Sequence, residues 1–198
     1  MGYTAFDRFV ALCRFRAALP HVRPGAWACD IGCGIDARFL EWAGDRIGFG
    51  VGLDRQGNHC NRRARIVRAD ITLRLPLRSS CFDHALMLAV LEHLPQPMPV
   101  LRGTFRILRP GGSLILTWPD AAVDPILRGL RRLRFVSDEM ESEDHQLRLS
   151  LGTLLEMLRE IGFERFTHRR FELGLNNLLI AYKSGCISPP LRRMRTHG

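Results

Sequence analysis

Aspartates and glycines at the ends of short apolar runs are the residues of this chain that could hold a nucleotide. The run at 26–31 passes into a glycine pair, and two later runs end in aspartate. Glycines let a ligand lie against bare backbone, and a carboxylate after a strand accepts hydrogen bonds from ribose hydroxyls or an exocyclic amine. The residues of this predicted site are Asp30, Gly32, Gly34, Asp54 and Asp70, with Ile71 packed on the base.

Two aspartates decide which kind of nucleotide fits the glycine turn. The segment GCGIDA at 32–37 also satisfies the G-x-G-x-x-G/A pattern of dinucleotide folds. A pyrophosphate there would be flanked by Asp30 and Asp36, and at ~4 Å and an effective dielectric of ~20 one such repulsion costs roughly 4 kcal/mol. A ligand with positive charge is therefore favoured, and we expect Asp36 to cap the helix that follows.

A second group of titratable residues follows the apolar run at 82–89. Glu92 and His93 stand directly after that run, and His145 lies between an acidic stretch and a later helix. His93 and His145 are candidate general bases, and Glu92 could orient a base or bind a metal. These three residues make an incomplete ligand set, so we predict no metal. The alternative is that Glu92 and His93 only brace the turn.

Alternating strand-like and helical segments must position these residues. Residues 4–18 place Phe6, Phe9, Val10 and Cys13 on one stripe of an amphipathic helix. Such alternation predicts an α/β fold with a parallel sheet and helices on both faces. Only a loop or one helical turn is expected between Asp54 and Arg65, because the connection is short. Strands are expected at 26–31, 47–54, 65–70, 82–89 and 112–118, and helices at 36–43 and 98–108.

The remaining segments complete the predicted domain. Ser150 can cap a helix at 151–161, Gly162 can end it, and two strand-like runs follow at 163–171 and 176–184. We expect one domain over residues 1–184, of which 1–20 form an N-terminal helix and 119–145 form a substrate cover. Residues 185–198 make a basic tail that we expect to be disordered.

Composition limits the classes of protein that this chain can be. It has 198 residues, 46% of them apolar, which suffices for one well-buried domain. No run reaches the roughly 18 apolar residues of a membrane span, and the first residues lack the apolar core of a signal peptide. We therefore expect a cytoplasmic protein. Its six cysteines show no repeated C-x-x-C spacing, which argues against a zinc site or a disulfide framework.

The chain is strongly basic. Its 29 basic and 20 acidic residues give a net charge of +9. Such a surplus permits binding to nucleic acid, anionic lipid or a phosphorylated substrate. The arginines are dispersed through every segment, however, so a biased base composition of the source genome explains the surplus equally well.

Five short motifs together resemble a known family. DIGCG, GLD, RADI followed by LPL, FDHALMLAVLEHL and ILRPGGSLIL occur in the order found in class I S-adenosylmethionine-dependent methyltransferases of the methyltransferase-11-like, small-molecule type. The resemblance runs from about Gly25 to Trp118, and more loosely to Lys183. It implies a Rossmann-like, doubly wound sheet of seven strands, mainly parallel, whose last strand is antiparallel.

The same resemblance assigns roles to the predicted site. It implies S-adenosylmethionine as the cofactor, with Gly32 and Gly34 near its methionine portion and Asp54 on its ribose. Asp70 and Ile71 would lie at the adenine, and the backbone around Ala89 near the methionine amine. The family pattern often has a third glycine where this chain has Asp36. This difference affects how closely the cofactor can approach the turn, and not whether it binds.

Methyl transfer to oxygen of a small molecule, lipid or sugar is the function that this resemblance favours. Transfer from a sulfonium is an in-line displacement, so positioning and exclusion of water can supply most of the catalysis. The chain lacks the N/D-P-P-Y/F turn of exocyclic amino methyltransferases and a proline-flanked cysteine. Two alternatives stay open: a methyltransferase-like module that binds cofactor without catalysis, and an RNA methyltransferase with a basic surface.

Overall fold

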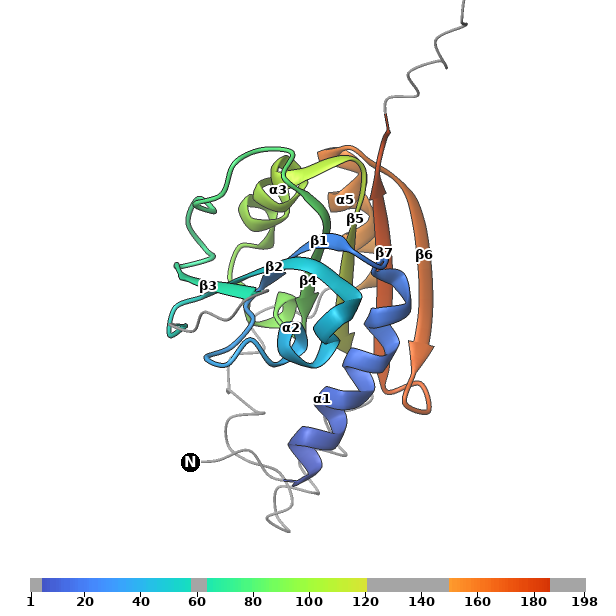
Figure 1. The fold of residues 1–198 in the computed structure, drawn as a ribbon. Helices are drawn as coiled ribbons and strands as arrows, with labels where there is room; N and C mark the ends of the chain where they lie inside the picture. Colours follow the sequence, from blue (N-terminus) through green and yellow to red (C-terminus); the bar gives the residue numbers. More distant parts are fainter. Residues whose placement is uncertain (1–4, 58–63, 121–149, 186–198) are drawn as a thin grey trace, which may run out of the picture.

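A seven-stranded sheet with helices on both faces forms the fold (Figure 1). The computed structural model describes residues 5–57, 64–120 and 150–185. The strands stand in the order β3-β2-β1-β4-β5-β7-β6. Their bounds are Ala26–Ile31 (β1), Ile47–Asp54 (β2), Ala64–Arg68 (β3), Phe82–Leu88 (β4), Leu108–Pro119 (β5), Phe163–Phe171 (β6) and Asn176–Lys183 (β7).

Strand directions confirm the predicted fold class. Strands β3, β2, β1, β4 and β5 pair in parallel, whereas β7 is antiparallel to both of its neighbours, β5 and β6. The order reverses between β1 and β4, and ligands of open α/β sheets bind beyond the carboxyl ends of the strands at such a point. The carboxyl ends of β1, β2 and β4 are therefore the place to look for a site.

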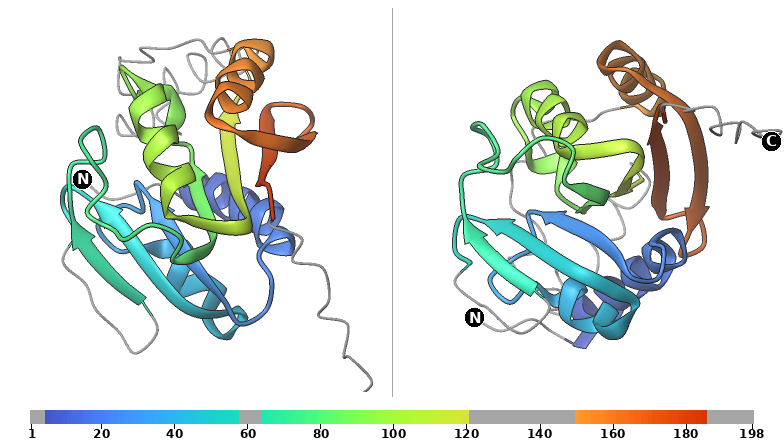
Figure 2. Two further views of the ribbon diagram at one scale, coloured as in Figure 1. Left: turned by 90° about the horizontal axis from the view of Figure 1, so that it is seen from above. Right: turned by 45° about the horizontal axis from the view of Figure 1, so that its top comes forward.

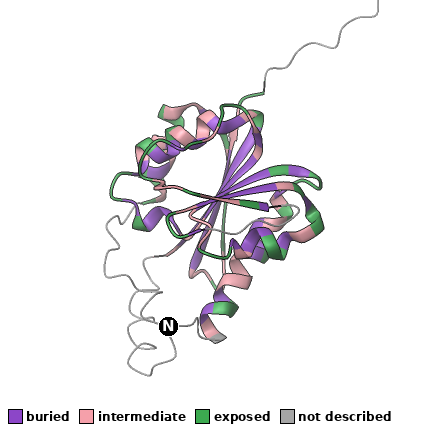
Figure 3. Cartoon of the chain, turned by 60° about the vertical axis from the view of Figure 1, so that its left-hand side comes forward, coloured by how far each residue is buried: buried purple, intermediate pink, exposed green. Residues whose placement is uncertain are grey.

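In the part of the chain that the structure describes, helices cover both faces of the sheet, two on each (Figure 2). Helices α1 (Ala5–Ala18) and α2 (Arg38–Ala43) pack on one face, and α3 (Pro97–Ile107) and α5 (Leu151–Ile161) pack on the other. Short 3₁₀ turns occur at η1 (Leu19–His21), η2 (Gly44–Arg46) and η3 (Leu91–His93). Burial concentrates in the central strands, which lie between the two helical layers (Figure 3). The predicted doubly wound arrangement is thus confirmed.

Helix α5 begins and ends as its sequence predicts. The Ser150 hydroxyl accepts a hydrogen bond from the backbone N–H of Thr153 at 3.1 Å, which satisfies one of the donors left open at a helix start. Gly162 ends the helix in the left-handed conformation, with φ of 113°.

The helix after the glycine turn differs from its prediction. It begins at Arg38, and the residue at its cap position is Ala37, which has φ of 44° and no side-chain cap. Asp36 is exposed in the preceding turn. The expectation that Asp36 caps this helix is therefore wrong, because the chain turns through a left-handed residue before the helix can start.

The face that α1 turns to the sheet also differs from the predicted stripe. Phe9, expected on the buried side, is 58% exposed, whereas the buried positions include Asp7, Val10 and Ala17. These positions follow one another at helical spacing and place Arg14 between Val10 and Ala17 on the same side. The sheet-facing stripe of α1 therefore carries polar residues, which hydrophobic periodicity cannot predict.

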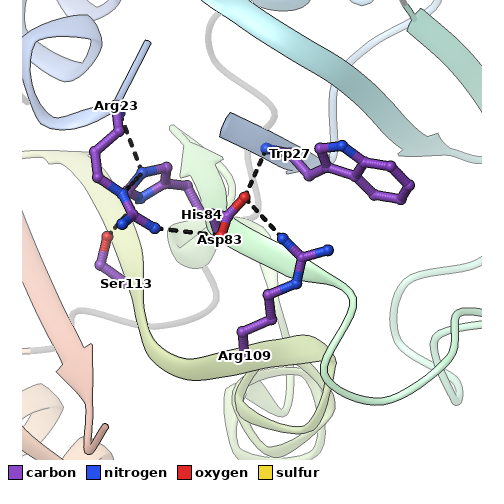
Figure 4. Close-up of polar contacts among 6 residues, drawn as sticks. All are labelled: Arg23, Trp27, Asp83, His84, Arg109 and Ser113. Atoms are coloured by element: carbon purple, nitrogen blue, oxygen red, sulfur yellow. Dashed lines mark hydrogen bonds and ion pairs between the residues drawn. The ribbon is translucent and has the colours of Figure 1, made fainter. Parts of the chain in front are cut away.

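A polar cluster joins the amino ends of β1, β4 and β5, at the edge opposite the glycine turn (Figure 4). Asp83 accepts hydrogen bonds from the Trp27 backbone N–H at 2.9 Å and from Arg109 at 3.0 Å, and it pairs with Arg23 at 3.2 Å. These charge-assisted bonds tie the strand starts together. The cluster braces the edge of the sheet that does not bind ligands in this type of fold.

Some predicted features lie outside the described residues. They are His145, most of the expected substrate cover at 119–145 and most of the tail at 185–198. Within the part of the chain that is described, no helix is both long and apolar enough to cross a bilayer.

Candidate cofactor site at the carboxyl edge of the sheet

The structure brings the glycine turn and Asp54 together. The backbone N–H of Gly34 donates to Oδ2 of Asp54 at 3.0 Å, and that of Gly32 donates to the carbonyl of Leu53 at 2.8 Å. The turn after β1 is thereby fastened to the end of β2. The distant sequence positions that were predicted to share a ligand do lie beside each other.

Asp54 is held by backbone donors on both of its oxygens. Oδ1 accepts from the backbone N–H of Gln56 at 3.0 Å, while Oδ2 accepts from Gly34. A carboxylate oxygen has two lone pairs, so each keeps one for a further donor. The Asp54 carboxylate is oriented before any ligand arrives, and it can still accept from two adjacent hydroxyls.

Asp30 is a buried carboxyl group on β1 with only 3% of its surface exposed. Burial, followed by repulsion from the Asp54 carboxylate, raises the pKa of Asp30 to about 7. A positive group at this edge would stabilise the ionised form and offset both effects. The pair Asp30 and Asp54 thus makes this position suited to a cation and unsuited to a phosphate.

Positions 32 and 34 both favour glycine, because Gly32 and Gly34 have positive φ values of +75° and +74° that residues with side chains rarely adopt. They differ in their surroundings. A Cβ atom on Gly32 would lie 2.6 Å from Cγ2 of Val90, in the segment after β4, whereas one on Gly34 would meet nothing within 4 Å. Gly32 allows the two loops to pack closely, and Gly34 leaves open space where a ligand can approach the backbone.

Ala89 follows β4 with φ of 59°, an uncommon conformation for a residue with a side chain. Its N–H donates to the carbonyl of Thr117 on β5 at 2.9 Å. Because the N–H is already bonded, the carbonyl is the backbone group of Ala89 that is left to accept from a ligand. Strained backbone of this kind is concentrated at functional sites.

Asp70 and Ile71 stand at the same edge, beyond β3. The N–H of Ala69 donates to the carbonyl of Asp54 at 2.9 Å, which links the two strand ends. Oδ1 of Asp70 accepts from the hydroxyl and the backbone N–H of Thr72, and these two bonds lower the pKa of Asp70. Asp70 is thus an acceptor, as contact with an amine requires, and Ile71 is half-buried against the core.

Cys33 is a member of the site region that the sequence analysis did not single out. Its thiol packs against β2 where Gly52 has no side chain, since a Cβ there would lie 2.5 Å from Sγ. Burial and the neighbouring Asp30 and Asp54 raise the pKa of this thiol. Cys33 therefore packs the glycine turn against β2, in the space that the missing side chain of Gly52 leaves.

Glu92 and His93, both in η3, lie in opposite environments. His93 is exposed, whereas the Glu92 side chain is only 7% exposed. Burial raises the pKa of Glu92 to about 7, although the nearby Arg14 guanidinium acts in the opposite direction. The catalytic roles of His93 and His145 stay predictions. Among the residues that the structure describes, no group of three or more His, Cys, Asp or Glu could hold a metal ion.

An open sheet of this order, with a glycine turn and carboxylates at its carboxyl edge, is what the resemblance to class I S-adenosylmethionine-dependent methyltransferases implies. Residues 29–116 match the family model described as a methyltransferase domain. The chain therefore contains a methyltransferase domain of this class, and S-adenosylmethionine is the cofactor that the family implies.

Curated relatives agree with this assignment. The chain is 33% identical over 168 residues to 27-O-demethylrifamycin SV methyltransferase of Amycolatopsis mediterranei, a match that covers 76% of this chain and 58% of that protein. It is 28% identical over 105 residues to ubiquinone biosynthesis O-methyltransferase of Xanthomonas campestris, covering 48% and 43%. The chain thus spans less than two thirds of the length of these relatives.

Solved structures share the fold. An S-adenosylmethionine-dependent methyltransferase of Thermotoga maritima superposes with a TM-score of 0.63 at 18% identity, covering 89% of this chain and 90% of that one. One from Mesorhizobium loti superposes with a TM-score of 0.61 at 21% identity, covering 85% and 95%. At these identities the likeness establishes the architecture alone.

Proposed function

We propose that this protein transfers the methyl group of S-adenosylmethionine to an oxygen atom of a small molecule, lipid or sugar. The observation that carries the proposal is the buried Asp30 beside the backbone-held Asp54, at the carboxyl edge of a methyltransferase fold. Such an edge favours a cation and a ribose over a pyrophosphate.

Individual residues fit the parts of this cofactor. Asp54 can accept hydrogen bonds from both ribose hydroxyls, and Asp70 can accept from the adenine amine while Ile71 packs on the ring. Gly34 provides open backbone for the methionine portion. The Ala89 carbonyl and the Asp30 carboxylate would receive its ammonium group. When bound, the cofactor supplies an electrophilic methyl group on a sulfonium.

The protein's own residues would hold the cofactor in position and keep water away from the reacting groups. Gly32 and Val90 pack the two loops closely, so the edge of the sheet is rigid where the cofactor lies. A protein base is optional for this displacement. His93 and His145 are the proposed bases, and a general base contributes typically 10²–10⁴-fold where it is used.

Oxygen as the acceptor atom is supported by two relatives that are named for O-methylation. The charge of the edge also bears on the acceptor. Asp30, Asp54, Asp70 and Glu92 gather there, which disfavours a polyanion such as RNA despite the net charge of +9. A neutral acceptor suits the edge better.

Calorimetric titration with S-adenosylmethionine, followed by a methyl-release screen over RNA and metabolite pools, tests the proposal. We expect the protein to bind the cofactor and to methylate a component of a metabolite pool. We expect a metal chelator to leave the rate of that turnover unchanged. Absence of cofactor binding would contradict the enzyme function. Binding without turnover on any pool would favour the cofactor-binding module, and turnover on RNA would favour the basic-surface alternative.

A further inference from the structure

Strand β6 is the last strand at one edge of the sheet, beside β7 (Figure 1). It is nine residues long, and its neighbour β7 pairs with it along one side. In an antiparallel pair, every second residue of the outer strand directs its N–H and C=O groups away from the partner. Among the described residues, no strand pairs with this outer side of β6. A row of backbone donors and acceptors is thus open to another chain.

The outer side of β6 is regular. Edge strands in natural proteins are commonly kept short, interrupted by proline or twisted away by a bulge. The sequence of β6 contains no proline or glycine, and its register with β7 shifts only at its start, between Phe163 and Arg165. At the opposite edge of the sheet, β3 has only five residues. From Arg165 to Phe171, β6 is therefore the longer and more regular template for one more strand.

The exposed side chains of β6 are mainly basic. They include Arg165, His168, Arg169 and Arg170, while Glu164 is the single acidic residue of the strand. Side chains alternate between the two faces of a strand, so Arg165 and Arg169 share one face and Arg170 lies on the other, where it pairs with Asp120 at 3.0 Å. Basic residues on an edge disfavour pairing with a strand of like charge and favour an acidic one.

Arg165 and Arg169 keep their charge available to a partner. The Arg165 guanidinium lies over the ring of Tyr182, with 4.9 Å between its Cζ atom and the ring centroid. Arg169 donates to the backbone carbonyl of Ala17 at 3.0 Å. Within the part of the chain that the structure describes, neither guanidinium pairs with a carboxylate. Two unneutralised positive charges therefore stand four positions apart on one face of the open edge.

We propose that the outer edge of β6 binds an extended acidic segment of a partner protein, which adds one strand to the sheet. The backbone of the partner would complete the ladder of hydrogen bonds, which supplies affinity without regard to sequence. Carboxylates four residues apart on the partner would lie opposite Arg165 and Arg169, which supplies the preference for an acidic segment. This inference does not depend on methyl transfer.

Two other occupants fit the edge less well. In the antiparallel pairing of two copies that uses the whole strand, the two-fold axis passes through Thr167 and sets Arg165 opposite Arg169, so like charges meet. A nucleic acid could meet the arginines, but it has no regular row of amides and carbonyls to pair with those of β6. An acidic polypeptide satisfies both the backbone and the charges.

The test measures binding of a fluorescent peptide to the full chain by anisotropy. The probe is as long as β6, has blocked ends and alternates glutamate with threonine. Three comparison probes are the same peptide with lysine in place of glutamate, the acidic peptide with N-methylated backbone amides, and a short single-stranded RNA of the same net charge. We expect the acidic peptide to bind more tightly than each of them by about tenfold or more.

Substitutions on the two edges of the sheet locate the binding. We expect Arg165→Thr combined with Arg169→Thr to weaken binding of the acidic peptide by roughly fivefold or more. Arg165→Thr alone should give part of this loss, and it leaves the bond from Arg169 to Ala17 intact. The matched control is Arg65→Thr, which removes an exposed arginine from β3 and should change affinity by less than about twofold. Melting temperatures of the variants show whether a loss reflects unfolding.

Hydrogen exchange distinguishes strand addition from attraction between charges. The bound peptide should slow exchange of alternate amides of β6 and leave those of β3 unchanged. Absence of peptide binding would overturn the proposal, and so would equal binding of the N-methylated peptide or of the RNA. Equal losses in Arg65→Thr and Arg165→Thr would also overturn it. Protection of β6 in the protein without peptide that disappears on dilution would assign the edge to a second copy instead.

Discussion

Arg14 of the N-terminal helix lies near enough to Glu92, in the turn that follows β4, for its guanidinium to oppose the rise in the pKa of that buried carboxyl. Arg14 shares the sheet-facing side of α1 with Val10 and Ala17, and Glu92 is buried. This relationship makes α1 part of the wall of the carboxyl edge. A helix that the sequence presented as a simple amphipathic cover thus contributes a charged group next to the proposed active site.

Replacing Asp54 with alanine should weaken cofactor binding at least tenfold. The carboxylate is fixed by Gly34 and Gln56, so its two free lone pairs are already directed when the ribose arrives. Tenfold corresponds to about 1.4 kcal/mol, the size of one well-made hydrogen bond to a charged group. Isothermal calorimetry measures the change. Asp36→Ala, which removes an exposed carboxylate from the same turn, should change affinity by less than twofold; equal losses would show that the ribose contact is misplaced.

Cofactor affinity should fall as the pH is lowered through 7. The pKa of Asp30 is raised to about 7 in the folded protein, so the carboxyl must lose a proton before it can pair with a cation. Affinity is then fully present above pH 7 and falls by up to about tenfold per pH unit below it. Calorimetry from pH 5.5 to 8 gives the profile. Asp30→Asn should flatten it, whereas a slope that persists in Asp30→Asn but disappears in Glu92→Gln would assign the titration to Glu92.

Gly32→Ala should destabilise the protein more than Gly34→Ala does. Both residues have positive φ, so each substitution adds roughly 1 kcal/mol of backbone strain. At Gly32 the new methyl group would also meet Val90, and overpacking of this kind costs about 1–3 kcal/mol. Urea unfolding of the two variants compares the losses directly. Equal destabilisation would mean that the loop after β4 yields to the added atom.

Stability should fall in acid because of His84. Nε2 of this buried imidazole accepts from the Arg23 backbone N–H at 3.1 Å, so the proton resides on Nδ1, which donates to Ser113 at 2.8 Å. Burial, with Arg23 nearby, lowers the pKa of His84 to about 4, so the unfolded chain binds more protons between about pH 6.5 and 4. Stability from His84 is complete above pH 6.5 and declines below it, by at most about 3 kcal/mol at pH 4.

Urea unfolding of the wild type and of His84→Gln at a series of pH values isolates this contribution. The acidic groups Asp30 and Glu92, whose pKa values are raised, act in the opposite direction over the same range, and both proteins retain them. The difference between the two proteins therefore belongs to His84. A difference that does not vary between pH 4 and 7 would contradict the lowered pKa.

The sequence by itself determined the sheet and the cofactor edge. The strand runs, the caps at Ser150 and Gly162, and the glycine turn are local features, because they depend on residues near each other in the chain. The motif order then supplied the family. This information sufficed to predict that Asp30, Gly34 and Asp54 would lie together at one edge of the sheet, and their sharing of one ligand stays a prediction.

Tertiary structure alone decided what surrounds that edge. Hydrophobic periodicity assigned Phe9 to the buried side of α1, but Phe9 is exposed and Arg14 is buried near Glu92 and Glu172. Asp36 could not cap α2, because Ala37 occupies the cap position in a left-handed conformation before the helix begins at Arg38. Both outcomes depend on packing between segments that are distant in sequence, and no local pattern encodes the free energy of such packing.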